Sequence, residues 1–172
     1  IIIGALGSCV IGIIGYRFIH ILNRIGTWVL GIGIMVGFAY IFSHIDSADF
    51  FTRGGFHFAG WLATVSLSAL WQIAFAPYVS DYSRYLPVNV KVSATFWTTY
   101  LGSTVGSALS FVFGVSAALS VPECMDTMEA VKQATGPLGI VMLILFLLSV
   151  VSHNALNLYG AVLAVITSAQ TF

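Results

Sequence analysis

Long apolar stretches alternate with short polar connections along almost the whole chain. Five stretches are long enough to be interpreted as membrane spans, since a helix that crosses a bilayer needs about 20 mostly apolar residues. They cover residues 1–16, 25–42, 58–78, 92–120 and 138–170. The pattern predicts an all-α integral membrane protein, with about five transmembrane helices in a single domain over residues 1–172.

The composition excludes a water-soluble domain. The chain is 59% hydrophobic and 7% charged, with a mean hydropathy of +1.00, whereas soluble domains are about 25% charged. We therefore expect a lipid bilayer as its surroundings. The formal net charge of +0 gives no indication of nucleic acid, and no such partner is expected. The chain starts without Met inside an apolar stretch and ends without a polar tail, so we expect a segment of a longer protein.

The distribution of charge predicts the topology. The first and third connections hold four of the six Lys and Arg residues and a single acid. The four basic residues are Arg17, Arg24, Arg84 and Lys91. Because positively charged loops stay in the cytoplasm, residues 16–24 and 79–91 are predicted to be cytoplasmic loops of a multi-pass protein in the plasma (inner) membrane. The acid, Asp81, precedes Arg84 by three residues, a spacing that allows an ion pair.

Small residues recur at helical spacing in several stretches. The repeats include Gly4, Gly7 and Gly12, Gly33-xxx-Gly37, Gly102-xxx-Gly106 and Ser110-xxx-Gly114. In lipid, helices associate through close packing of small residues, because the bilayer supplies no hydrophobic drive between them. We interpret these repeats as helix-packing faces and assign them no chemistry.

The third stretch carries a polar and aromatic pair, Trp71 and Gln72, inside its apolar region. Counting from Phe58 at about 1.5 Å per residue places Trp71 about 20 Å from the outer end of the span. A glutamine at that depth needs a partner. Either Gln72 bonds a neighbouring helix and Trp71 fills the core, or the pair meets a planar polar solute. Pro77 follows, and we expect the helix to end, kink or unwind there.

The fifth stretch carries a second cluster of polar residues after a wholly apolar run over residues 138–148. Its members are Ser149, Ser152, His153, Asn154 and Asn157. At 100° per residue four of them share one arc of the helix, with Asn154 at its edge. His153 is about 24 Å from Pro137, close to the depth of Trp71. Polar groups at such depth usually line a pathway, so we expect both groups to face one cavity; the alternative is that they only bond neighbouring helices.

Three segments resemble the nucleobase–cation symporter family, the purine and cytosine permeases. Trp71–Pro87 (WQIAFAPYVSDYSRYLP) is similar to the signature of that family's sixth helix. Residues 15–20 (GYRFIH) resemble its link between helices four and five, and residues 154–159 (NALNLY) resemble its eighth helix. The resemblance covers essentially the whole chain and implies helices four to eight of a leucine-transporter-like inverted-repeat bundle, whose site lies near the bilayer midplane.

The resemblance also implies roles for individual residues. Trp71 would lie at or beside the aromatic position that packs on the base, with Gln72 as its neighbour, and Asn154 and Asn157 would bind the edge of the base. An amide offers a donor and an acceptor, which suits such an edge.

Sodium-coupled members of the family bind the ion through a carbonyl and two hydroxyls at i, i+3 and i+4 of the eighth helix. Here these positions are the carbonyl of Ser149, then Ser152 and His153. Since histidine titrates near neutral pH, its presence in place of a hydroxyl favours H⁺ over Na⁺ as coupling ion. No resident metal or other cofactor is expected.

Together these features predict a secondary active transporter that imports a nucleobase, cytosine or a purine, by cation symport. The expected partner is a small heteroaromatic substrate, and the oligomeric state stays open. A channel would need a polar stripe along a whole span, and an enzyme would need an intramembrane acid, a His pair or a metal cluster. The alternatives are a transporter of a related ring compound, such as a hydantoin, allantoin or a vitamin, or a structural membrane subunit without transport.

Overall fold

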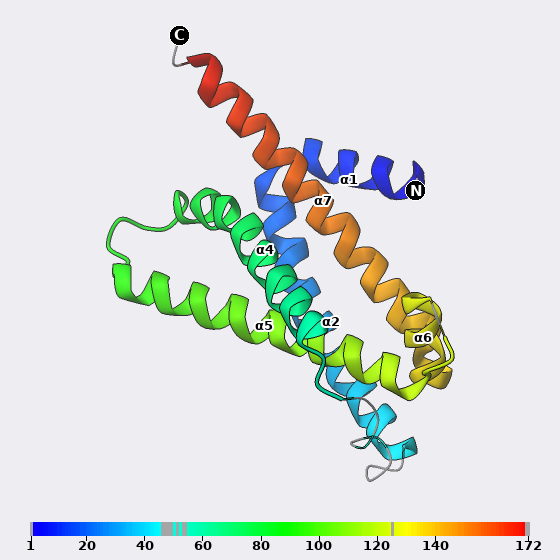
Figure 1. Ribbon diagram of the computed structural model, residues 1–172. Coiled ribbons are helices and arrows are strands. Elements are labelled where there is room, and N and C mark those ends of the chain that lie inside the picture. Colours follow the sequence, from blue (N-terminus) through cyan, green and yellow to red (C-terminus); the bar gives the residue numbers. More distant parts are fainter. Residues whose placement is uncertain (1, 46–49, 51, 53–54, 125, 171–172) are drawn as a thin grey trace. The chain divides into compact units, whose positions relative to one another are not determined.

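The computed structural model describes residues 2–45, 50, 52, 55–124 and 126–170, and contains helices but no strand among them (Figure 1). The α-helices are α1 (Ile2–Ile14), α2 (Tyr16–His44), α4 (Phe58–Ser83), α5 (Val92–Ser120), α6 (Thr127–Ala134) and α7 (Gly139–Gln170), and the 3₁₀ helix η1 (Gly136–Leu138) precedes α7. The predicted all-α class is therefore confirmed.

Four helices in the described part of the chain are long and apolar enough to cross a membrane. Their apolar segments are Tyr16–His44, Phe58–Asp81, Val92–Ser120 and Gly136–Ala169. The predicted span over residues 1–16 is observed as α1, which has 13 residues and is therefore shorter than the bilayer requires. It ends because Gly15 adopts a φ of +99°, a conformation that favours glycine and interrupts a helix.

The start of α2 corrects one prediction. Residues 16–24 were expected to form a loop, yet α2 begins at Tyr16, directly after Gly15. The single residue Gly15 provides the turn between α1 and α2, and charge alone does not end a helix, since Arg is a good helix former. The two basic residues of this segment, Arg17 and Arg24, are therefore held on a helix.

A second finding concerns Pro77. Of the three predicted outcomes there (an end, a kink or unwinding), the end and the unwinding are not observed, because α4 continues through Pro77 to Ser83. Proline removes one backbone donor, whereas leaving the helix in an apolar environment would expose several backbone groups. Beyond the helix end, Arg84 Nη2 lies 3.3 Å from Asp81 Oδ1, which confirms the predicted pairing.

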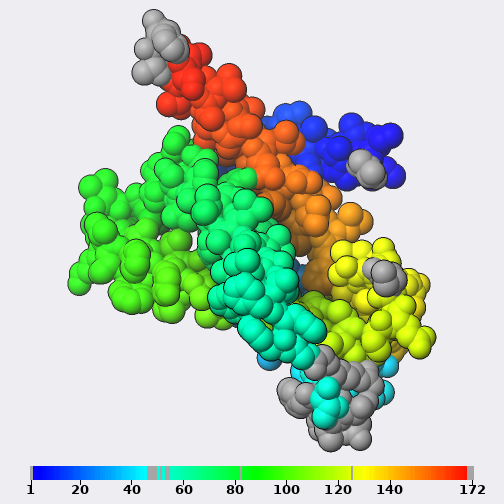
Figure 2. Space-filling model, in the orientation of Figure 1, coloured from blue at the N-terminus to red at the C-terminus, as the bar shows by residue number. Residues whose placement is uncertain are grey.

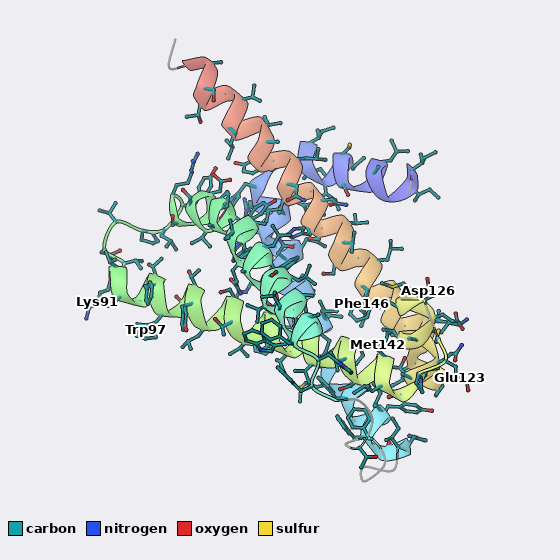
Figure 3. All side chains as sticks on the ribbon, in the orientation of Figure 1. Lys91, Trp97, Glu123, Asp126, Met142 and Phe146 are labelled. Carbon is teal, nitrogen blue, oxygen red and sulfur yellow. The ribbon has the colours of Figure 1, made fainter. Side chains whose placement is uncertain are left out.

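The chain divides into two compact units, residues 1–50 with 112–172 and residues 51–111. The core of the first unit lies between α2, α6, α7 and the end of α5, and consists of Ile34, Ile41, Phe113, Ala117, Val131 and Met142. Met142 and Phe146 lie one turn apart on α7 (Figure 3), and the Phe146 ring meets that of Phe113 at 6.0 Å.

Glycines allow this close approach of α2. A Cβ atom at Gly33 would lie 2.7 Å from Cδ1 of Leu145, and one at Gly37 would lie 2.7 Å from Cε2 of Phe113. Such distances are well below ordinary van der Waals contact, so the predicted packing face at these two glycines is confirmed.

The connection between α5 and α7 is ordered by α6. The Asp126 carboxylate accepts a hydrogen bond of 2.8 Å from the Glu129 backbone N–H, which caps the helix. Hydrogen bonds from Gln133 and then from Lys132 lower the pKa of the Glu129 carboxyl. Gly136, with a φ of +51°, lies against the Tyr40 ring, where a larger residue would clash.

The second unit consists of α4 and the first part of α5, joined by residues 84–91. Within this unit, no atom lies within 4 Å of a Cβ placed at Gly102 or Gly106. The packing face predicted for this helix is therefore not observed at these two glycines. A polar side-chain bond from Gln72 to Ser107 joins the two helices.

Candidate functional site

All five predicted polar residues of the fifth stretch lie on α7, in the first unit, but their surroundings differ. Ser152 is buried, with an exposed fraction of 7%. His153 and Asn157 are half-buried, whereas Ser149 and Asn154 are exposed. The polar band of α7, defined as these five residues, thus extends from a buried face of the helix to an exposed one.

Helix α2 packs against the buried edge of this band. The Ser152 hydroxyl donates a hydrogen bond of 2.5 Å to Oδ1 of Asn23, and the rings of Tyr16 and Tyr159 lie 5.9 Å apart. Asn23 follows Tyr16 by seven residues and Ser152 precedes Tyr159 by seven, so the two helices run antiparallel. Ile19, which is 0% exposed, lies on α2 between the two contacts.

Helix α1 also packs on α7 (Figure 2). The Ser8 hydroxyl, on a side chain that is 1% exposed, donates to the carbonyl of Gly4 at 2.9 Å and to that of Val151 at 3.1 Å. Cβ atoms at Gly7 and Gly12 would lie 3.5 Å from Val151 and 3.7 Å from the Ala155 carbonyl oxygen. The glycine face of α1 is therefore a packing face, as predicted, and it supports the helix that carries the polar band.

The amide of Asn157 has an unsatisfied acceptor. Its Oδ1 atom is buried and has no hydrogen-bond partner among the described residues. A buried acceptor without a partner costs about 1–3 kcal/mol, and in native proteins such atoms are few and call for an explanation. Within the polar band, Oδ1 of Asn157 is thus an atom at which a donor from another molecule would be stabilising.

The predicted pair on α4 lies in the second unit. Gln72 Nε2 donates to Ser107 Oγ at 3.4 Å, a long bond that uses one of the two N–H groups of the amide. This contact is the helix-to-helix bond of the first interpretation. Trp71 is 49% exposed and does not fill a core. The cavity shared by Trp71 and His153 stays a prediction, because the two residues belong to different units.

Three residues near the polar band were not predicted as site residues. Asn23, His20 and Tyr16 fall in the segment that was assigned to a cytoplasmic loop, and the rings of Tyr16 and His20 stack at 5.9 Å. Their spacing of four and three residues is that of one helix face, so the sequence contained a usable signal. Ser107, which accepts from Gln72, had no such signal.

No family model matches the chain. No solved structure matches it either. Among curated proteins, it is 34% identical over 173 residues to the "Putative purine-cytosine permease YxlA" of Bacillus subtilis (strain 168), an alignment that covers 99% of this chain. The chain spans 38% of the length of that relative. Together with the apolar helices, this similarity identifies a segment of a multi-pass membrane protein and confirms the predicted resemblance to the nucleobase–cation symporter family.

Proposed function

We propose that this chain is part of a secondary active transporter, and not of an enzyme, that imports a nucleobase, cytosine or a purine, by cation symport. The observation that carries the proposal is the similarity along 99% of the chain to a protein named as a purine-cytosine permease. The polar band fits this function, because it interrupts a 32-residue apolar helix, and polar groups inside the membrane usually line a pathway.

The proposed substrate contacts are Trp71, Gln72, Asn154 and Asn157. Asn157 is supported by its unpartnered Oδ1, since nucleobases carry ring and exocyclic N–H groups that can donate to an amide oxygen. Trp71 is supported by its half-exposed ring, because an aromatic face can stack on a planar base. The bond from Gln72 to Ser107 supports a role for Gln72 in holding α4 on α5, and its substrate contact rests on the family resemblance.

The proposed cation centre consists of the Ser149 carbonyl, the Ser152 hydroxyl and His153. The buried Ser152 and the half-buried His153 are adjacent on α7, and an imidazole is the side chain best suited to bind and release a proton near neutral pH. We therefore favour H⁺ over Na⁺. In this proposal the protein lies in the plasma (inner) membrane, with the start of α2 and residues 79–91 at the cytoplasmic side.

Contacts within the first unit support the alternation of the spans, on which this orientation depends. Alternating spans would make the first and fifth parallel and the second and fifth antiparallel. The order of contacts agrees with both, since Gly7 and Gly12 of α1 meet successive turns of α7 at Val151 and Ala155, whereas α2 runs against α7.

Uptake of labelled cytosine and adenine by cells that express the full-length protein, with pH and Na⁺ varied separately, tests the proposal. We expect saturable uptake of at least one base that rises as the external pH falls. Asn154→Ala should abolish uptake with membrane expression intact, whereas Asn89→Ala, a change of the same type in the connection after α4, should have no effect. If no purine or pyrimidine is taken up or displaces the transported compound, the nucleobase assignment is wrong, and dependence on Na⁺ without pH dependence would exclude proton coupling.

A further inference from the structure

The contact between Asn23 and Ser152 determines which way the serine hydroxyl points. Oδ1 of an asparagine amide carries no hydrogen, so the hydroxyl of Ser152 must donate the bond of 2.5 Å that joins them. This distance is at the short end of the range for O–H···O bonds. Because Ser152 is buried, its hydroxyl has little access to water as an alternative acceptor.

This bond leaves Ser152 with acceptor capacity only. A serine hydroxyl has one hydrogen and two lone pairs, and here the hydrogen is directed to Asn23. The Ser152 oxygen can therefore still accept a hydrogen bond or bind a cation, but it cannot donate to a substrate. A hydroxyl oriented in this way suits a cation site, where the ligand must present oxygen lone pairs to a positive charge.

Asn23 is itself held in place by the packing of α2. Ile19, one turn earlier, is 0% exposed, and the Thr27 hydroxyl, one turn later, donates to the Asn23 carbonyl at 2.8 Å. Further along α2, Gly33 allows close contact with α7. A partner on a well-packed helix can fix the orientation of a ligand group, as outer-shell hydrogen bonds do in metal sites.

We propose that Asn23 is a positioning residue of the cation centre, which it serves by holding the Ser152 hydroxyl with its oxygen available to the coupling cation. This inference rests on the proposed function. It adds α2 to the elements that build the centre, in a segment that was predicted to be a loop outside the membrane. In the alternative, the bond only ties α2 to α7.

The test uses uptake of labelled base by the full-length protein carrying Asn23→Leu, Asn23→Asp, Ser152→Ala, or Asn23→Leu with Ser152→Ala. Asn23→Leu should raise the half-saturating cation concentration about 10- to 100-fold, as loss of an outer-shell partner typically does. The half-saturating base concentration at saturating cation should change less than about twofold, because Asn23 acts only through Ser152. Asn23→Asp keeps an acceptor oxygen for the Ser152 hydroxyl and adds a negative charge that favours a cation, so its half-saturating cation concentration should be no higher than that of the wild-type protein. The double variant should be no worse than Ser152→Ala alone.

Ser8→Ala is the matched control, because it also removes a buried hydroxyl bond to α7, at the Val151 carbonyl. It should leave the half-saturating cation concentration unchanged. The inference is overturned if the wild-type protein transports a base and Asn23→Leu keeps the wild-type cation dependence, or if Ser8→Ala shifts this dependence equally. Absence of base uptake by the wild-type protein would overturn the proposed function and this inference together.

Discussion

Replacement of Asn157 by leucine should make the protein more stable and inactive. The two side chains have similar shape, but leucine has no polar atom. In the structure, Oδ1 of Asn157 is buried without a partner, so the substitution removes an unsatisfied acceptor. A substitution that stabilises a protein and abolishes its activity is expected where a binding group is kept at a cost to folding.

The magnitude follows from the cost of an orphan acceptor, about 1–3 kcal/mol. The free energy of unfolding of the Asn157→Leu variant should rise by an amount at the lower end of this range, because the Asn157 side chain as a whole is only half-buried. Substrate should stabilise the wild-type protein in addition, by about 2.7 kcal/mol at a concentration of 100 Kd. The variant should show no such gain, because the acceptor that binds the base is gone.

Thermal unfolding of purified full-length protein in detergent, with and without cytosine or adenine, measures both effects, and uptake in cells measures the loss of function. Ser152→Ala serves as the contrasting variant: it removes the hydrogen bond from Ser152 to the half-buried Asn23 and should lower the Tm. The reasoning is refuted if Asn157→Leu lowers the Tm of the substrate-free protein, since Oδ1 would then have a structural partner in the full-length protein. It is equally refuted if the variant retains stabilisation by the base.

Two further predictions concern packing. Gly37→Ala should destabilise the full-length protein by about 1–3 kcal/mol, because the new methyl group would lie 2.7 Å from the Phe113 ring, and that ring is only 2% exposed and has little room to move. Gly31→Ala lies on the same helix but has no neighbour within 4 Å, so it should instead stabilise the protein by about 0.5–1 kcal/mol through helix propensity. Equal Tm shifts for the two variants would contradict the close packing of Gly37 against Phe113. Gln72→Leu and Ser107→Ala should lower the Tm to a similar small extent, since interhelical hydrogen bonds in membranes are worth about 0.6 kcal/mol; loss of uptake in Gln72→Leu alone would indicate the substrate contact.

Hydrophobic patterning predicted most of the fold. The bounds of α5 and α7 differ from the predicted stretches by at most one residue. The reason is that helix-breaking or charged residues precede each stretch: Pro87 and Lys91 before α5, and Gly136 with Pro137 before α7. Where the helix-breaking residues and the hydropathy indicate the same boundary, the length of a membrane helix can be predicted from the sequence alone.

Sequence and structure differ where only one of these two signals is present. At the start of α2, charge predicts a loop, but Gly15 is the residue there that breaks a helix, and α2 begins directly after it. At Pro77, the proline predicts an end, a kink or unwinding of the helix, yet the helix neither ends nor unwinds, because the apolar environment maintains it. Both cases follow from the same physics, since in lipid the backbone must satisfy its own hydrogen bonds, so a helix continues unless the chain can turn at once.

The candidate site could be predicted only in part, for a related reason. Depth along a helix follows from counting residues, and this located the polar band of α7. The partner of each polar group depends on the register between helices, which counting within one stretch does not provide. Asn23 lies in the predicted loop over residues 16–24, although its spacing from Tyr16 and His20 is that of one face of a helix. In the structure this face of α2 meets α7, since the rings of Tyr16 and Tyr159 lie 5.9 Å apart and the Ser152 hydroxyl donates to Asn23; the antiparallel topology predicted from charge agrees with this order of contacts but does not determine it.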